Sequence, residues 1–287
     1  MIHPTPDPDE VGAFVQARAE VLGRIAAAAV RAGRDPAGVT LVAVSKTVRA
    51  ARVRAAVAAG LDILGENRVQ EAAGKIPEVP GARWHLLGPL QSNKARRAAE
   101  LFDMIQAVDS DDLARRLDRI AGEVRPGRPL SILLQVNVAD DPSKAGFGAA
   151  ALEAVMPRVL DLPNLRIDGL MTIGRLVETA EAARPTFRAL RDLSAELRTR
   201  WPRLGPELSM GMSDDYEVAV EEGATLVRVG RALFGERPPH PAVDGASRPS
   251  TGPDPGPLVD SGPWVPSSRS SSAPSSASCG CWSWAAC

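Results

Sequence analysis

The sequence predicts a single (β/α)8 TIM barrel, in which eight parallel strands alternate with helices and close into a ring. Eight short apolar runs occur between residues 40 and 229, and helical patterns separate them. Strands that alternate with helices form parallel sheets, and eight such units in roughly 225 residues approach the ~250 residues typical of this barrel. A doubly wound open sheet is the alternative. It usually has fewer strands and a glycine-rich first turn, and the first turn here, VSKTVRA, contains no glycine.

An extra helix is expected before the first strand. Between Val11 and Ala32 the apolar residues recur at helical spacing, and Gly33 follows as a stop signal. We therefore expect residues 1–10 to form an N-terminal extension and residues 11–236 to form the barrel with its added helix.

The eight predicted strands are short and mostly apolar. In chain order they cover Thr40–Val44, Ile63–Gly65, Trp84–Leu87, Met104–Val108, Ser131–Val138, Leu165–Met171, Glu207–Met210 and Thr225–Val229. Seven helical patterns separate them, of which Asp111–Glu123 and Thr186–Trp201 are the clearest. Pro185 precedes the second of these helices, at a first-turn position where proline is tolerated.

The composition changes after Gly235. Residues 237–287 are mostly proline, serine, glycine and alanine, so they cannot bury enough apolar surface to offset chain entropy, and we expect a disordered tail. Its last residues, CGCWSWAAC, hold all three cysteines of the chain. They could bind a metal or form a disulfide, and the alternative is that these cysteines are incidental.

Charge and composition exclude several functional classes. The formal net charge is −1, which gives no bulk attraction to nucleic acid or to an anionic membrane. The sequence lacks the ~18 consecutive apolar residues of a membrane span, and its start does not resemble a signal peptide. A barrel without cysteines suits the cytoplasm, and three scattered histidines are too few for a histidine-based metal site. We expect a cytoplasmic monomer without a metal, a nucleic-acid partner or a membrane partner.

Lys46 is the most informative residue at the strand ends, where barrels of this kind place their active sites. The chain has only four lysines against thirty arginines, and Lys46 lies two residues after the end of the first strand. In a partly apolar barrel mouth a lysine loses hydration and its pKa falls, so the neutral amine can form a Schiff base with a carbonyl. An arginine cannot do this. The alternative is that Lys46 reaches solvent or pairs with Glu66.

The ends of the last two strands predict a phosphate site, because barrels often bind phosphate there. After the eighth strand, in GRALFG, Gly230 lets an anion approach the backbone and Arg231 adds a positive charge. After the seventh strand, Ser209 offers a hydroxyl and Gly211 an open N–H. The alternative for GRALFG is a glycine that is needed at a crowded strand–helix junction.

An amine and a phosphate site across one barrel mouth suit a ligand that carries an aldehyde and a phosphate about one ring apart, as pyridoxal 5′-phosphate (PLP) does. Arg228 alternates with two valines in the eighth strand, so it can point inward near the ring. An arginine opposite the pyridine nitrogen keeps that nitrogen unprotonated and weakens the electron sink. His85, Asn137 and Met171, at other strand ends, are further candidates to line the site. A phosphate-binding barrel without PLP is the remaining alternative.

Several motifs together resemble the YggS/PROSC family of pyridoxal phosphate homeostasis proteins. They are LVAVSKT, GENRVQEA, WHLLGPLQSNK, GLMTI and SMGMSDDYEVAVEEGATLVRVGRALFG, spread over residues 11–236. The resemblance implies a fold type III barrel like the N-terminal domain of alanine racemase, with PLP held as a Schiff base on Lys46 and no established turnover. It also implies that Asn67 lies beside the cofactor, that Ser209, Gly230 and Arg231 hold its phosphate, and that Arg228 meets the pyridine nitrogen.

The sequence departs from this family at three places. Position 68 is arginine where the family often has tyrosine, and position 231 is arginine where a small hydroxyl residue is common. The second change leaves backbone donation intact but alters side-chain contacts. The segment after Gly235 resembles nothing in the family.

A carrier is favoured over an enzyme, because racemisation needs two acid/base groups on opposite faces of the cofactor. The single tyrosine, Tyr216, follows SMGMS on a predicted helix and is expected to pack in the core. His85 is the remaining candidate base, although it can equally be a hydrogen-bonded strand-end histidine. We expect a protein that holds PLP and regulates or delivers it, with apo PLP-dependent enzymes as partners. A weak amino-acid racemase is the alternative.

Overall fold

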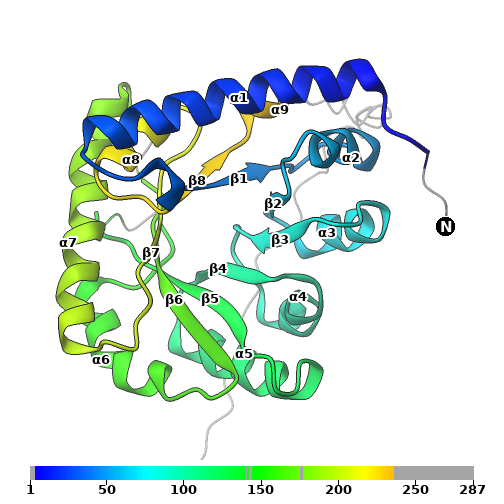
Figure 1. Ribbon diagram of the computed structural model, residues 1–287. Helices are drawn as coiled ribbons and strands as arrows, with labels where there is room; N and C mark the ends of the chain where they lie inside the picture. Colours follow the sequence, from blue (N-terminus) through cyan, green and yellow to red (C-terminus); the bar gives the residue numbers. More distant parts are fainter. Residues whose placement is uncertain (1–3, 140, 142–143, 175–176, 236–287) are drawn as a thin grey trace, which may run out of the picture. The chain divides into compact units, whose positions relative to one another are not determined.

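The structure, a computed structural model, describes residues 4–139, 141, 144–174 and 177–235. Its strands form one closed barrel in the order β1 to β8, and each strand runs parallel to both neighbours (Figure 1). The ring closes where β1 pairs with β8, from Thr40 opposite Leu226 to Ala43 opposite Val229. The predicted (β/α)8 barrel is therefore confirmed. The predicted disordered tail, residues 237–287, lies outside the described residues, together with its cysteines.

The strands are short, and most lie within one or two residues of their predicted positions. They are β1 (Thr40–Val44), β2 (Ile63–Glu66), β3 (Arg83–Leu86), β4 (Met104–Val108), β5 (Leu130–Gln135), β6 (Leu165–Met171), β7 (Glu207–Ser209) and β8 (Leu226–Val229). The prediction that β5 reaches Val138 is wrong. After Gln135 the chain turns, because the Gln135 side-chain amide donates to the Ala145 carbonyl and the Asn137 amide donates to the Asp141 carbonyl.

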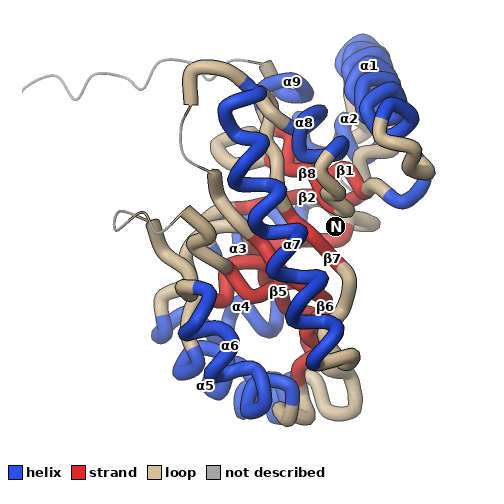
Figure 2. Tube along the Cα trace, turned by 90° about the vertical axis from the view of Figure 1, so that its left-hand side faces the viewer, coloured by secondary structure: helices blue, strands red, loops and turns tan. Residues whose placement is uncertain are grey.

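Helices surround the strands, as the red strands inside the blue helices show in Figure 2. They are α1 (Pro8–Arg31), α2 (Ala50–Ala58), α3 (Val69–Lys75), α4 (Ala95–Leu101), α5 (Asp111–Val124), α6 (Ala149–Leu160), α7 (Arg184–Arg200), α8 (Tyr216–Glu221) and α9 (Arg231–Phe234). Short 3₁₀ turns cover Pro36–Gly38, Ile76–Glu78, Ser92–Lys94 and Ala180–Ala183.

The extra helix α1 begins three residues before its predicted start. The Asp7 side chain caps it by accepting the N–H of Asp9 at 3.0 Å, and Pro8 occupies a first-turn position that needs no backbone donor. One face of α1 buries Phe14, Val21 and Ile25, and the helix lies across α2, α8 and α9 (Figure 1). It therefore covers the side of the barrel where β8 and β1 meet.

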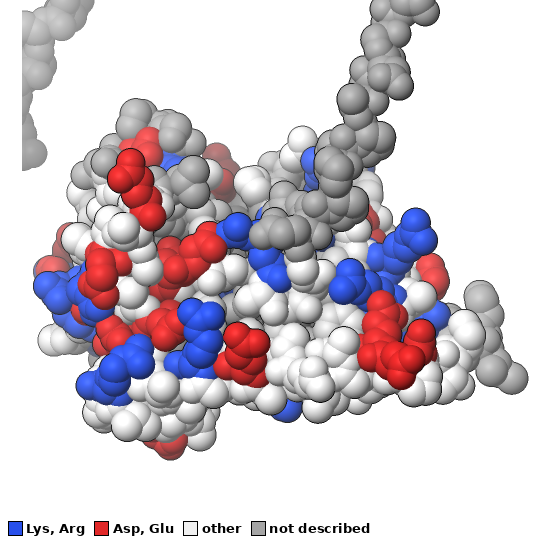
Figure 3. Space-filling model, turned by 90° about the horizontal axis from the view of Figure 1, so that it is seen from above, with Lys and Arg blue, Asp and Glu red and all other residues white. Residues whose placement is uncertain are grey.

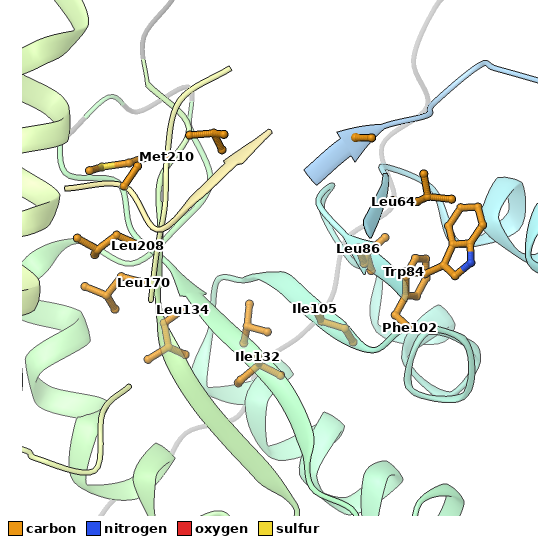
Figure 4. Close-up of a cluster of buried hydrophobic side chains, with 14 of the residues drawn as sticks. Leu64, Trp84, Leu86, Phe102, Ile105, Ile132, Leu134, Leu170, Leu208 and Met210 are labelled. Atoms are coloured by element: carbon orange, nitrogen blue, oxygen red, sulfur yellow. The ribbon is translucent and has the colours of Figure 1, made fainter. Parts of the chain in front are cut away.

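The apolar core has two parts, because successive strand residues point to opposite faces of the sheet. In β5, Ile132 and Leu134 face the helices, whereas Leu133 faces the barrel interior with Ala107 and Met171. Figure 4 shows the outer part, with labelled side chains that include Leu64, Leu86, Ile105, Ile132, Leu134, Leu170 and Leu208.

A β-bulge in β4 changes what reaches the barrel interior. The pairing of β4 with β5 shifts between Ile105 and Val108, and a bulge puts one extra residue on one strand. Ala107 packs inside the barrel, and the preceding residue, Gln106, is also fully buried and hydrogen-bonded to side chains of β3 and β7. The bulge thus admits a polar side chain beside the apolar interior.

Candidate cofactor site

A cavity of about 490 Å³ lies at the C-terminal ends of β1 and β8. This volume falls within the range of small-molecule sites. Its lining consists of Glu10, Val44, Lys46, Thr47, Val48, Arg49, Ala51, Arg52, Gly230, Arg231, Phe234 and Gly235. Residues predicted from two separate motifs therefore line one cavity, namely Lys46 from the first and Gly230 and Arg231 from the second.

The Lys46 turn has an unusual backbone. Lys46 is half-buried between fully buried Ser45 and exposed Thr47, whose φ of 66° lies in the left-handed region. For a β-branched residue such a conformation costs roughly 1–3 kcal/mol and persists only when neighbouring contacts hold it. The Thr47 N–H donates to Glu71 Oε1 at 2.5 Å, and the Thr47 hydroxyl donates to the Lys46 carbonyl at 2.6 Å.

A second lysine lies beneath this turn. Lys75 Nζ donates to the Ser45 carbonyl at 2.7 Å, to Glu66 Oε1 at 2.7 Å and to Glu71 Oε1 at 2.6 Å. The Ser45 hydroxyl donates to the same Glu66 oxygen at 2.7 Å. Burial raises the pKa of Glu66, although the hydrogen bond from Lys75 opposes this rise. The ion pair of Glu66 is thus made with Lys75, where the sequence had suggested Lys46 as one possible partner.

The opposite side of the cavity is built from the loop after β8, and side chains of the loop after β7 contact that loop. The Gly230 N–H donates to Ser213 Oγ at 3.2 Å, and Arg231 forms an ion pair with Asp214. A Cβ at Gly230 would lie 3.4 Å from the Val44 carbonyl oxygen, which is an ordinary contact distance. Crowding at the junction therefore does not require this glycine. Because glycine has no Cβ, no side chain stands between its half-buried backbone and the cavity that it lines.

Gly211 has a different explanation. Its φ is 89°, and a Cβ there would lie 2.5 Å from Ala219 Cβ and 2.9 Å from Tyr216 Cα. Glycine is thus required by the turn that ends β7 and by the close approach of α8. The Gly211 carbonyl accepts the N–H of Arg228 at 3.0 Å, which ties this turn to β8.

A chain of buried polar side chains crosses the barrel interior. Arg228 Nη1 donates to Ser209 Oγ at 2.7 Å, and the Ser209 hydroxyl donates to Gln106 Oε1 at 2.6 Å. Gln106 Nε2 lies 2.9 Å from His85 Nδ1. Arginine can only donate, so the serine proton must point to Gln106, whose amide then donates to His85. The chain therefore fixes the imidazole with its proton on Nε2.

Burial sets the charges in this chain. It lowers the pKa of His85 to about 4, so the imidazole is neutral near pH 7. It also lowers the pKa of Arg228 to about 10, and the carboxylate of Asp215 partly opposes this effect. Arg228 therefore remains a buried cation, whose Nη2 also donates to the Thr172 carbonyl at 2.8 Å.

The other predicted residues are not part of the cavity lining. Asn67 is half-buried at the end of β2, and the Asn137 side chain bonds to the backbone of its own loop. Met171 is fully buried in the apolar cluster inside the barrel, and Ser209 is fully buried within the polar chain. Of the predicted set, Lys46, Gly230 and Arg231 line the cavity.

Four residues of the site were not predicted. They are Glu71 and Lys75 beneath the Lys46 turn, Gln106 in the buried chain, and Ser213 beside Gly230. The pairing of Glu71 with Lys75 could have been predicted, because acidic and basic residues four positions apart on a helix face each other. Gln106 was visible only as one polar residue in an apolar run.

Comparison with known proteins places the chain in a family. A model described as the alanine racemase N-terminal domain matches residues 24–238. The pyridoxal phosphate homeostasis protein of Pseudomonas aeruginosa is 49% identical over 224 residues, which are 76% of this chain and 94% of that protein. This chain belongs to the pyridoxal phosphate homeostasis protein family. The relative from Escherichia coli is 43% identical over 230 residues, again 76% of this chain and 94% of that protein.

Solved structures align with the same part of the chain. PipY of Synechococcus elongatus, solved without PLP, has a TM-score of 0.67 at 49% identity and covers 75% of this chain and 99% of its own. The same protein with PLP bound has a TM-score of 0.66 at 47% identity, with 75% of this chain and 100% of its own covered. An alanine racemase of Clostridium difficile, at 13% identity and a TM-score of 0.58, shares the fold alone.

Tyr216 of this family member packs beside α1. Its side chain is buried, its hydroxyl has no hydrogen-bond partner among the described residues, and the Arg24 guanidinium lies 5.4 Å from its ring centre. Burial raises the pKa of this hydroxyl.

The described residues contain no cluster of three potential metal ligands, and none of their helices is long and apolar enough to cross a membrane.

Proposed function

We propose that this chain holds PLP covalently on Lys46 and regulates or delivers it within the cell, without robust turnover. One observation carries the proposal. Lys46 and Gly230 line a single cavity of suitable volume. PipY, nearly half identical in sequence, has been solved with PLP bound. When bound, PLP supplies an aldehyde that reacts with a neutral primary amine, which is the chemistry that only a lysine can meet here.

Residues of the β7 and β8 loops would hold the phosphate. The Gly230 backbone N–H donates to the Ser213 hydroxyl, so an anion that enters between the loops and replaces this bond can accept from both groups. Arg231 adds a cation that Asp214 holds nearby. We assign Ser209 a different role from the one its motif suggested, since its hydroxyl is fully used by Arg228 and Gln106.

Arg228 would define the ring end of the site. It is a buried cation that can still donate from nitrogen atoms not engaged by Ser209 and Thr172. A donor cation beside the pyridine nitrogen disfavours protonation of that nitrogen. This weakens electron withdrawal by the ring, which suits storage of the cofactor better than catalysis.

The site offers no matched pair of acid and base groups. His85 is neutral, accepts a hydrogen bond at Nδ1 and has a pKa near 4, far from the value that an efficient base needs at neutral pH. Tyr216 is buried against α1. We therefore favour a carrier or regulator that acts as a cytoplasmic monomer and passes PLP to apo-enzymes. A weak amino-acid racemase is the second candidate.

Two measurements test this proposal. The purified protein should absorb visible light through bound cofactor, whereas a phosphate-binding barrel without PLP would be colourless. Incubation of the loaded protein with single L-amino acids, followed by chiral chromatography, should yield no D-isomer. D-isomer formation that disappears in Lys46→Ala would overturn the carrier assignment in favour of the racemase.

A further inference from the structure

Three side chains from β2 and α3 surround the turn that carries Lys46. Lys75 bonds to the carbonyl of Ser45, the residue before Lys46, and Glu71 accepts the N–H of Thr47, the residue after it. Glu66 accepts the Ser45 hydroxyl. The backbone on both sides of Lys46 is thus tied to the same helix, α3. We call Glu66, Glu71 and Lys75 the ionic clamp.

The members of the ionic clamp also bond to one another. An ammonium group has three N–H donors, and Lys75 has three acceptors within 2.7 Å, in Ser45, Glu66 and Glu71. Its side chain is only 10% exposed, and that of Glu66 is fully buried. A lysine whose donors are all engaged has no lone pair to offer an aldehyde. The neighbouring Lys46, which lines the cavity, is therefore the amine presented to a ligand.

The backbone conformation of Thr47 explains why contacts such as those of the clamp are needed. Thr47 has a φ of 66°, which a threonine adopts only when other contacts hold it. Without the Glu71 acceptor, the Thr47 N–H would lose a charge-assisted hydrogen bond, and the turn would relax toward ordinary dihedral angles. Because Lys46 is the adjoining residue, relaxation would turn its side chain away from the cavity.

We propose that Glu71 and Lys75 are positioning residues that hold the Lys46 turn in the geometry needed for covalent attachment. The proposal rests on the assignment of Lys46 as the PLP attachment residue. It requires that loss of the clamp lowers the affinity for ligands that bond to the amine. The affinity for ligands that use only the phosphate and ring contacts should remain nearly unchanged.

A pair of ligands and a pair of variants separate these effects. PLP carries the aldehyde, and pyridoxine 5′-phosphate has the same ring and phosphate but no aldehyde. Glu71 is partly exposed, so its replacement is safer for folding than that of Lys75. Glu71→Leu removes the acceptor, whereas Glu71→Gln keeps an oxygen for the Thr47 N–H. Glu100→Leu, which removes an ion pair with Arg97 on α4, is the matched control.

In Glu71→Leu, we expect PLP affinity to fall about tenfold or more, the usual effect of losing a hydrogen bond to a charged group. Affinity for pyridoxine 5′-phosphate should change less than about threefold, and Glu71→Gln and Glu100→Leu should resemble the wild type for both ligands. Equal losses for both ligands in Glu71→Leu, or no loss for PLP, would overturn the positioning role.

Amide hydrogen exchange at Thr47 in the ligand-free protein gives a readout that does not depend on PLP. The exchange should accelerate in Glu71→Leu and stay near the wild-type rate in Glu71→Gln. An unchanged rate in Glu71→Leu would overturn the clamp even if PLP binds. Failure of the wild type to bind PLP, with accelerated exchange in Glu71→Leu, would instead count against the proposed function and leave the clamp supported.

Discussion

Beneath the Lys46 turn one ammonium and two carboxylates are packed together with little exposure to solvent, whereas a larger set of charges, most of them more exposed, joins α1, α7 and α8. The outer set joins Arg24 and Arg31 of α1, Glu217 and Glu221 of α8, Arg184, Arg188 and Arg191 of α7, and Glu222. Arg24 and Arg31 are each 52% exposed, compared with 10% for Lys75. On the face shown in Figure 3, blue and red side chains are interleaved rather than segregated.

The two networks differ in redundancy. Glu222 accepts from Arg184, Arg188 and Arg191, so the loss of one arginine leaves it two cations. Among the described residues, Glu66 pairs with one cation, Lys75, and its second oxygen has no hydrogen-bond partner. A surface network thus tolerates change and joins helices, whereas the clamp fixes one turn and fails if one member is lost.

The largest expected effect is that of Lys75→Met. The change leaves the carboxylate of Glu66 buried without its cation, which typically costs about 3–5 kcal/mol. Urea unfolding near neutral pH measures the free energy directly. A loss below about 1 kcal/mol, the scale of a surface ion pair, would remove the distinction between the two networks.

Acid should affect the two networks in opposite directions. Burial raises the pKa of Glu66 above 4.5. The folded wild type should therefore lose stability, relative to Glu66→Gln, as the pH rises from 4.5 through the raised pKa. At Glu222 burial acts against the bonds from Arg184 and Arg188, which prevail and lower its pKa below 4.5. Its contribution should be complete above 4.5 and lost as pH falls through the lowered pKa.

Unfolding free energies of the wild type, Glu66→Gln and Glu222→Gln, taken from about pH 3 to about pH 8, test these signs. The differences between wild type and variant should slope in opposite directions with pH. Stability differences that slope with pH in the same direction for both variants would contradict the expected difference between the two networks.

Arg184→Ala should have a smaller effect that depends on salt. Arg184 bonds to Glu221 and Glu222 at a partly exposed position, where a network arginine contributes about 1 kcal/mol. In about 1 M NaCl, where screening acts within ~3 Å, this loss should shrink, while the loss in Lys75→Met should hardly change. Equal salt sensitivity of the two variants would show that the clamp is as hydrated as the surface network.

Thr47→Gly should change stability least. Glycine relieves the strain of the left-handed backbone, which raises the free energy of unfolding by about 1–2 kcal/mol. Its greater freedom in the unfolded chain lowers the free energy of unfolding by roughly 0.5–1 kcal/mol. The expected net change is therefore within about 1 kcal/mol by thermal unfolding. A loss of more than about 2 kcal/mol would mean that the threonine side chain, rather than the clamp, holds the turn.

Local patterns were enough to predict the fold and the position of Lys46 at the barrel mouth from the sequence. Strand-length apolar runs and helical spacing are short-range signals, and Lys46 lies two residues after the end of such a run. The two serines of SMGMS show the limit. Ser209 is the last residue of β7 and faces the buried chain, whereas Ser213 lies beyond the turn at Gly211, next to Gly230. Which of them lies beside Gly230 depends on that turn and on the pairing with β8, which no local pattern reveals.

The ionic clamp and the buried chain depend on long-range geometry in the same way. Glu71 and Lys75 were visible as a helix pair, but their contact with the Lys46 turn arises only when β1 and β2 lie side by side. Gln106 reaches Ser209 across the barrel because of the bulge in β4, and nothing in the MIQAV run indicates a bulge.

The central claim is that Lys46 is the attachment point for PLP. Borohydride reduction of the PLP-loaded protein, followed by peptide mapping with mass spectrometry, tests it most directly, because the chain has only four lysines to distinguish. We expect the reduced pyridoxyl group on the peptide that contains Lys46 and not on those that contain Lys75, Lys94 or Lys144. A modification found mainly on another lysine, or none at all, would contradict the account.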